Sequence, residues 1–148
     1  MAHPATEDRL CDLCAPYGLI TGVCMSPADL KNDKFRDLAR QHFVSVTMTN
    51  EMKAYSLLNR EASMHSPDCM PVMDYALADR MVAFCRENGL RVRGHVLVWD
   101  AFMRDWFFRR DYDPEKPYAD KETVRQRTAY YIDQVIRHFE EYFPGSVY

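Results

Sequence analysis

The chain has 148 residues, of which 47% are hydrophobic and 28% charged, and this is enough apolar material for one ordinary globular core. Its formal net charge of -3 and the spread of Lys and Arg along the chain argue against the basic surface that a nucleic-acid partner requires. No apolar run approaches the roughly 18 residues of a membrane span, so we also expect no membrane partner.

The first residues predict an N-terminal helix within residues 1–16, capped near Thr6, with Leu10, Leu13 and Cys14 on its inner face. The chain has five cysteines, and Cys11-x-x-Cys14 lacks the second ligand pair of a structural zinc site. The pattern favours reduced thiols as small apolar fillers, with a metal or redox role as the alternative. The sequence leaves the location unknown: an odd number of free cysteines favours the cytoplasm, and an extracellular location would require a leader that was removed.

Predicted strands and helices alternate over residues 17–148, which is typical of a parallel sheet with right-handed crossovers. The predicted strands cover residues 19–23, 44–48 and 92–98, and residues 146–148 begin a fourth. A short helical stretch is predicted at 51–58, followed by a long loop marked by Ser66-Pro67 and Pro71.

Three longer helices are predicted from their caps and apolar faces. The first is capped by Asn32 or Asp33, the second runs from Asp74 to a stop at Gly89, and the third runs from Asp120 to Pro144-Gly145. The expected inner faces consist of Phe35, Leu38, Ala39 and His42 in the first; Leu77, Ala78, Met81, Val82 and Cys85 in the second; and Val124, Thr128, Tyr131, Ile132, Val135, Phe139 and Tyr142 in the third.

Two polar motifs accompany neighbouring strands: Thr49-Asn50-Glu51-Met52-Lys53 follows the second, and Arg93-Gly94-His95-Val96-Leu97-Val98-Trp99 lies on the third. The carboxyl ends of parallel strands meet at one edge, where loops carry chemistry. Amide and ammonium groups can bind hydroxyls, and an indole offers an apolar face. The alternatives are purely structural roles: a loop cap for Asn50, a solvated amine for Lys53, and core packing for His95 and Trp99.

The order Ile20-Thr21-Gly22, then TNEMK, then RGHVLVW is similar to the amino-terminal half of glycoside hydrolase family 10, whose best-known members are endo-β-1,4-xylanases. The resemblance covers residues 17–148 and includes the stretch from Asp74-Tyr75 to Asp79. It implies an α/β fold that is the first half of a (β/α)8 TIM barrel, with three βα units and the start of strand four, incomplete on its own. Residues 1–16 are then a separate N-terminal helix.

The resemblance also implies roles for individual residues. Asn50 and Lys53 would hold the glycone-side sugars of xylan or a xylo-oligosaccharide, His95 would bond to hydroxyls of the sugar under attack, and Trp99 would wall that subsite. A retaining glycosidase needs two carboxylic residues, and the family's two glutamates lie outside this chain, so we expect no catalytic residue within it. Glu51 and Asp100 are disfavoured as substitutes because isolated loop carboxylates are usually solvated. No cofactor or metal is implied.

Four positions depart from the usual family pattern: Thr49 stands where a glutamate is common, Ala54 where an aromatic residue is common, Asp100 where a histidine is usual, and Phe102 where the side chain is often polar. A donor exchanged for an acceptor can reverse selectivity among sugars. The substrate is therefore open between plain xylan, decorated xylan and another β-linked glucan.

Three hypotheses of function follow. The leading one is a part of an endo-β-1,4-xylanase that a complementary carboxyl-terminal half of the barrel completes; alone, the chain is expected to be inactive and to self-associate through open sheet edges. The second is a non-catalytic carbohydrate-binding module that keeps the four sugar-binding residues. The third is a small open α/β interaction domain in which His95 and Trp99 belong to the core.

Overall fold

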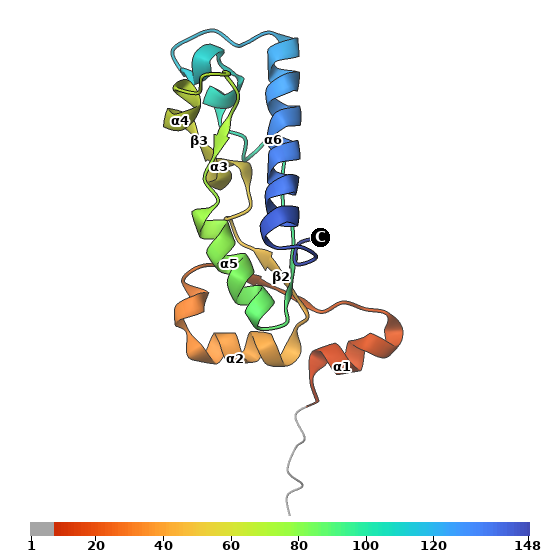
Figure 1. The fold of residues 1–148 in the computed structure, drawn as a ribbon. Helices are drawn as coiled ribbons and strands as arrows, with labels where there is room; N and C mark the ends of the chain where they lie inside the picture. The colour runs from red at the N-terminus through yellow and green to blue at the C-terminus, as the bar shows by residue number, and fades with distance from the viewer. Residues whose placement is uncertain (1–7) are drawn as a thin grey trace, which may run out of the picture.

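A small parallel sheet lies at the centre of the molecule in the computed structural model, which describes residues 8–148. Strands β1 (Gly22–Met25), β2 (Ser45–Met48) and β5 (Arg91–Arg93) are parallel, in the order β1-β2-β5 (Figure 1). Val147 forms a parallel bridge to Val92, so the predicted fourth strand segment lies beside β5. The α/β class with parallel strands is confirmed, whereas the number of βα units remains a prediction.

Two predicted strand boundaries are wrong. β1 begins at Gly22 because its register pairs Gly22 with Ser45, and this leaves Leu19 and Ile20 outside the sheet and largely exposed. β5 ends at Arg93, so His95 lies on the segment after the strand and not within it. The apolar pattern runs on past the strand because Leu97 packs against the core without strand pairing.

Two of the predicted helix caps, Asn32 and Asp120, agree with the structure, whereas the N-cap of the second predicted helix is Tyr75 and not Asp74. The Asn32 side chain accepts a hydrogen bond from the Phe35 amide (3.2 Å) at the start of α2 (Asp33–His42). Asp120 accepts one from the Thr123 amide (3.0 Å) at the start of α6 (Lys121–Tyr142). Because the short polar side chain at each cap satisfies a first-turn amide, these positions fix where the helices begin.

Helix α5 (Ala76–Glu87) begins two residues after Asp74, whose carboxylate accepts a hydrogen bond from the Ala76 amide (2.9 Å). Gly89 adopts φ of 69° just past the helix, as expected for a left-handed stop. On α6, His138 Nε2 lies 2.7 Å from Asp79 Oδ1, and its ring stacks on Tyr75 at 3.7 Å between centroids. These two contacts of His138 join α6 to the N-terminal end of α5.

The predicted inner faces are correct at their centres and wrong at some edges. One hydrophobic core contains Ala39 from α2, Ala78, Met81, Val82 and Cys85 from α5, and Tyr131, Val135 and Phe139 from α6. Leu38, Leu77 and Tyr142, also expected inside, are exposed. On the short α1 (Leu10–Cys14), Leu10 and Leu13 are exposed and Cys11 is buried instead; Thr6, the expected cap, lies outside the described residues.

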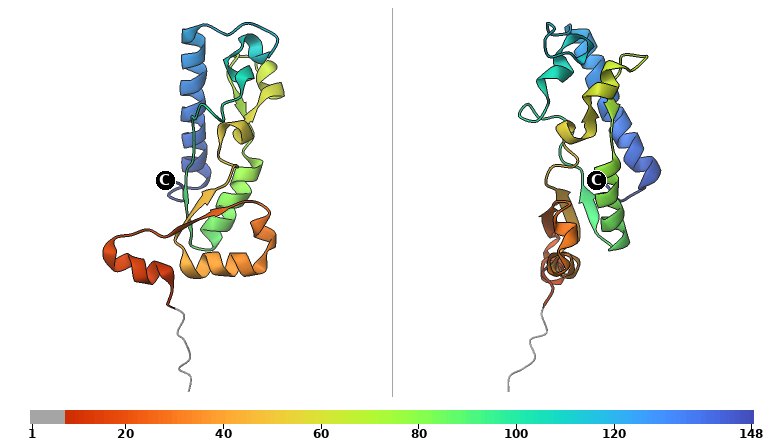
Figure 2. Two further views of the ribbon diagram at one scale, coloured as in Figure 1. Left: turned by 180° about the vertical axis from the view of Figure 1, so that it is seen from behind. Right: turned by 90° about the vertical axis from the view of Figure 1, so that its left-hand side faces the viewer.

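The segment predicted as a long loop contains secondary structure of its own. Between α3 (Ala54–Leu57) and α5, strands β3 (Leu58–Asn59) and β4 (Val72–Met73) pair in antiparallel fashion around α4 (Arg60–Met64). Together with the 3-10 helices η3 (Asp105–Phe108) and η4 (Arg110–Tyr112), they form the upper part of the molecule beside α6 (Figures 1 and 2). The lower 3-10 helices are η1 (Ala15–Tyr17) and η2 (Asp29–Lys31).

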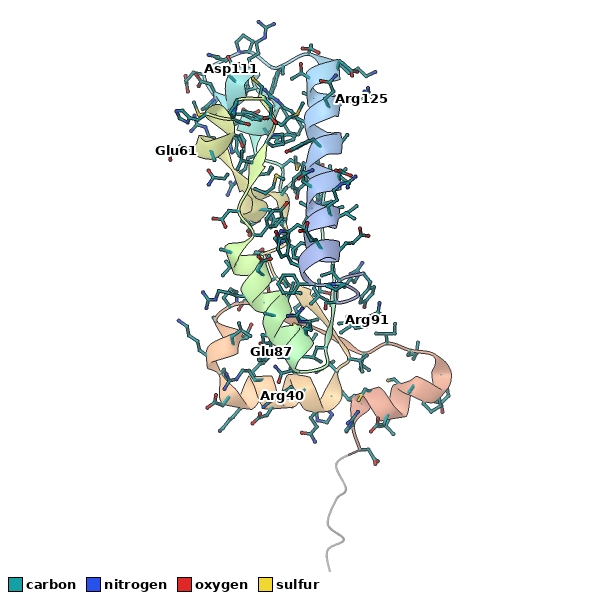
Figure 3. All side chains as sticks on the ribbon, in the orientation of Figure 1. Arg40, Glu61, Glu87, Arg91, Asp111 and Arg125 are labelled. Carbon is teal, nitrogen blue, oxygen red and sulfur yellow. The ribbon has the colours of Figure 1, made fainter. Side chains whose placement is uncertain are left out.

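The outer surface carries charges of both signs at both ends of the molecule (Figure 3). The labelled residues in that view are all exposed: Arg40, Glu61, Glu87, Arg91, Asp111 and Arg125. All five cysteines are free thiols. Within residues 8–148, no helix is long and apolar enough to cross a membrane.

Candidate functional site

The two polar motifs converge beyond the ends of adjacent strands. β2 ends at Met48 and is followed by Asn50 and Lys53, while β5 ends at Arg93 and is followed by His95 and Trp99. Because β2 and β5 are parallel neighbours, both segments leave the sheet at the carboxyl ends of the strands, on the same side of the sheet. The Lys53 ammonium lies 5.8 Å from the centroid of the Trp99 ring, so the two motifs meet in space.

Asn50 and Lys53 form a pair within one turn. Lys53 Nζ donates a hydrogen bond to Asn50 Oδ1 (3.1 Å), and the Asn50 backbone amide donates to Glu51 Oε2 (3.0 Å). The pair leaves the Asn50 amide N–H groups and two ammonium N–H groups of Lys53 for other acceptors. Both side chains are therefore held in place while they keep free donors for hydroxyl groups.

His95 and Trp99 stand beside this pair. Their ring centroids are 6.4 Å apart, and Trp99 is 41% exposed. His95 is half-buried and has no hydrogen-bond partner within the part of the chain that the structure describes. The exposed indole does not fit the hypothesis that Trp99 belongs to the core, and the imidazole retains both ring nitrogens for a ligand.

A hollow of about 310 Å³ adjoins only part of this site. It lies between the strand ends and α6, with His95, Met52 and Leu97 on one side and Val135, Phe139 and Phe143 on the other. Asn50, Lys53 and Trp99 do not line it. The four predicted residues are thus close together, but this hollow is not a common groove for all of them.

Two further aromatic side chains belong to the site. The Phe102 ring lies 4.5 Å from the Trp99 ring, and Lys53 Nζ lies 4.5 Å from the Phe102 centroid. Tyr55 follows at 5.4 Å from Phe102. The sequence marks Phe102 only as an unusual residue three positions after Trp99, and no spacing connects Tyr55 to it, because this contact joins distant parts of the chain.

The two carboxylates near these strand ends accept hydrogen bonds from backbone amides. Glu51 is buried and accepts the Asn50 amide, and exposed Asp100 accepts the amide of Ala101 (2.9 Å). Among residues 8–148, no group of three or more His, Cys, Asp or Glu side chains could hold a metal ion, at Cys11-x-x-Cys14 or elsewhere. With Lys53 beside the Trp99 and Phe102 rings, the geometry suits binding of a hydroxyl-rich molecule against aromatic faces.

Known proteins are similar to this chain in sequence or in fold. A putative endo-1,4-β-xylanase of Caldicellulosiruptor saccharolyticus is 43% identical over 97 residues, which cover 66% of this chain and 31% of that protein. Endo-1,4-β-xylanase B of Butyrivibrio fibrisolvens is 32% identical over 136 residues, covering 90% and 21%.

Among solved structures, the CBM22-1–GH10 modules of Clostridium thermocellum endo-1,4-β-D-xylanase 10B, in complex with xylohexaose, match all of this chain and 28% of that one, with a TM-score of 0.87 and 25% identity. The chain spans less than a third of the length of each of these three relatives. The family model of glycosyl hydrolase family 10 matches residues 9–147. The chain belongs to glycosyl hydrolase family 10.

Proposed function

We propose that this chain forms the glycone-binding part of a retaining endo-1,4-β-xylanase, which hydrolyses internal β-1,4-xylosidic bonds of xylan. Glycosyl hydrolase family 10 implies a (β/α)8 barrel, and the described residues form a partial α/β portion of that fold. The xylohexaose bound to the Clostridium thermocellum relative supports xylo-oligosaccharides as ligands of this chain as well.

One observation carries the proposal: the Asn50–Lys53 pair lies against the exposed Trp99 at the strand ends. A pyranose has C–H faces and a rim of hydroxyls, so it needs an aromatic wall and polar donors beside one another. Charge-assisted hydrogen bonds from Lys53 to a hydroxyl are stronger than neutral ones. In this proposal Asn50 and Lys53 hold the distal sugars, while His95 and Trp99 contact the sugar under attack.

The bond-breaking groups come from a complementary carboxyl-terminal half. Retaining hydrolysis needs a proton donor and a nucleophile whose carboxyl groups are about 5 to 5.5 Å apart. Glu51 and Asp100 do not offer such a pair, since each already accepts a backbone amide. The chain alone is therefore expected to bind xylo-oligosaccharides weakly and to hydrolyse none, and neither a metal nor an organic cofactor is needed for the reaction.

Reconstitution tests the proposal. The chain is mixed with the carboxyl-terminal half of a family 10 xylanase barrel, and reducing-sugar release from xylan is measured. We expect activity in the 1:1 complex and none in either half. Lys53→Met should lower kcat/KM about tenfold or more, because it removes a charged donor, whereas Lys34→Met on the exposed surface of α2 should leave it unchanged. A folded 1:1 complex without activity would refute the proposal.

The non-catalytic module is the second candidate, favoured by the exposure of Trp99 in the isolated chain. It differs from the leading proposal in the strength of binding. Titration of the chain with xylohexaose should give saturation for a true module, whereas part of a cleft should show only weak binding. Saturation that depends on Trp99, together with no gain of activity on reconstitution, would favour the module.

A further inference from the structure

The site continues beyond Trp99 as a row of three rings. We call Trp99, Phe102 and Tyr55 the aromatic row: the Trp99 and Phe102 centroids are 4.5 Å apart, and those of Phe102 and Tyr55 are 5.4 Å apart. Trp99 and Phe102 belong to the segment after β5, and Tyr55 belongs to α3. The right-hand view of Figure 2 shows that segment passing beside α3. The row therefore extends the site away from His95.

Two cations are held against this row. Lys53 Nζ lies 4.5 Å from the centroid of Phe102, and the Arg104 guanidinium carbon lies 5.1 Å from the centroid of Tyr55. Contact with a ring face orients a guanidinium without using up its N–H edge. Lys53 already donates to Asn50, whereas Arg104 keeps its N–H groups for a further acceptor.

Arg104 has no acidic partner within residues 8–148. Its neighbour Asp105 is engaged elsewhere: the carboxylate accepts from Arg109 Nε (2.8 Å) and from the hydroxyl of Tyr118 (3.0 Å). Asp100 accepts the amide of Ala101. Among the described residues Arg104 is thus a guanidinium without an ion pair at the outer end of the aromatic row, and its fork of donors matches a carboxylate in two parallel hydrogen bonds.

We propose that Arg104 binds the carboxylate of an acidic sugar, so that the site selects xylan chains that carry uronic-acid substituents. This inference rests on the proposed function, because it assumes that a xylan backbone lies along the row. The backbone sugars stack near Trp99, and the uronate side group reaches Arg104 at the Tyr55 end. A neutral chain leaves Arg104 in water and gains nothing from it.

The test compares two xylo-oligosaccharides of equal backbone length, one unsubstituted and one bearing a single glucuronosyl group. Binding to the full chain is followed by NMR titration at low and high salt. We expect the acidic ligand to bind about fivefold more tightly at low salt, which is the upper range for an exposed ion pair, and we expect the advantage to shrink in high salt.

Variants assign the effect to Arg104. Arg104→Gln should remove the advantage of the acidic ligand and leave neutral binding unchanged, and Arg104→Lys should keep part of it. Arg80→Gln, on the exposed surface of α5 and likewise without an ion pair in the described chain, is the matched control for net charge and should change neither. Equal affinity of the wild type for both ligands, or equal loss of both in Arg104→Gln, would overturn the inference.

The same titration separates this inference from the proposed function. Neutral binding that is lost in Trp99→Ala, without any preference for the acidic ligand, would contradict only the role of Arg104. Absence of any binding, in a chain whose circular dichroism confirms folding, would contradict both.

Discussion

Arg127 is the only lysine or arginine that is buried among residues 8–148, with 4% exposure. Its NH1 group donates to the carbonyls of Phe107 (3.2 Å) and Arg109 (2.8 Å), and its guanidinium carbon lies 3.8 Å from the centroid of the Tyr112 ring. Within residues 8–148 no carboxylate forms an ion pair with it, although the charge of Arg127 is among the causes that lower the pKa of Asp111. A buried cation is costly unless it is well hydrogen-bonded, and the two carbonyls that accept from Arg127 tie the 3-10 segment after the site to α6.

Replacing Arg127 should therefore destabilise the chain in a graded manner. Arg127→Met leaves two carbonyls without their donor and should cost about 2 to 3 kcal/mol, whereas Arg127→Lys keeps one charged donor and should cost less. Urea unfolding measures both, with Arg125→Met on the exposed face of α6 as the control. An Arg127→Met variant as stable as the wild type would show that its charged hydrogen bonds do not hold the segment.

At the scale of elements, Gly89 decides how α5 passes into β5. Its φ is 69°, and a Cβ added there would meet no atom within 4 Å. The effect of a substitution is therefore conformational strain alone. We expect Gly89→Ala to lower the free energy of unfolding by about 1 kcal/mol, and Gly89→Asn to lower it less, because asparagine tolerates this region better. Thermal unfolding of the two variants checks the order, and equal stability of both with the wild type would contradict it.

Local chemistry explains which elements the sequence could predict. Asn32, Asp120 and Gly89 act within three residues of their own position, so helix starts and the stop after α5 could be located from the sequence. Strand ends depend on partners far along the chain. Hydrophobicity alone extended the third strand to residue 98, although pairing with β2 ends at Arg93.

The candidate site also has features that the sequence could predict and features that it could not. The motifs and the rule for strand ends predicted that residues following β2 and β5 would meet, and Lys53 does lie near Trp99. The contact of Tyr55 with Phe102 joins α3 to the segment after β5, and the unpaired state of Arg104 depends on where Asp105 points. Such side-chain partnerships are set by packing across the fold, which no spacing in the sequence records.

At the scale of the whole molecule, buried tyrosine hydroxyls and a buried cysteine thiol make the free energy of unfolding depend on pH in the alkaline range. Burial raises the pKa of Tyr75 from 10.0 to about 12 and that of Cys85 from 9.0 to about 12, and it also raises the pKa of Tyr112 and Tyr131. At a pH between the ordinary pKa of a group and its raised pKa in the folded chain, the group is deprotonated in the unfolded chain and still protonated in the folded chain. The stability that these protonated groups contribute is therefore fully present below about pH 9 and is lost as the pH rises towards 12.

Tyr75→Phe tests this linkage. Within residues 8–148 the Tyr75 hydroxyl has no hydrogen-bond partner, and its ring stacks on His138, so phenylalanine keeps the stacking and loses the ionisable group. We expect no loss of stability at pH 7 and a smaller decrease between pH 8 and pH 11 than in the wild type. Urea midpoints across this range measure both, and an identical decrease in the variant would contradict a contribution from Tyr75.

The open edges of the sheet predict how the whole chain behaves in solution. β1 pairs with β2 on one side only, and in the described chain the segment around Val147 pairs with β5 only. Unpaired backbone groups at an edge recruit other strands, and exposed Val98 and Ile136 add apolar surface to the molecule. We therefore expect concentration-dependent self-association in analytical ultracentrifugation under reducing conditions.

Two exposed cysteines provide a matched pair of variants for this prediction. Cys24→Lys places a charge on the edge strand β1 and should shift the equilibrium towards monomer, whereas Cys69→Lys, outside the parallel sheet, should not. The complementary barrel half, which would cover the same edges, should compete with self-association. A chain that remains monomeric up to millimolar concentration, or an equal effect of the two variants, would show that the sheet edges do not mediate contacts between copies.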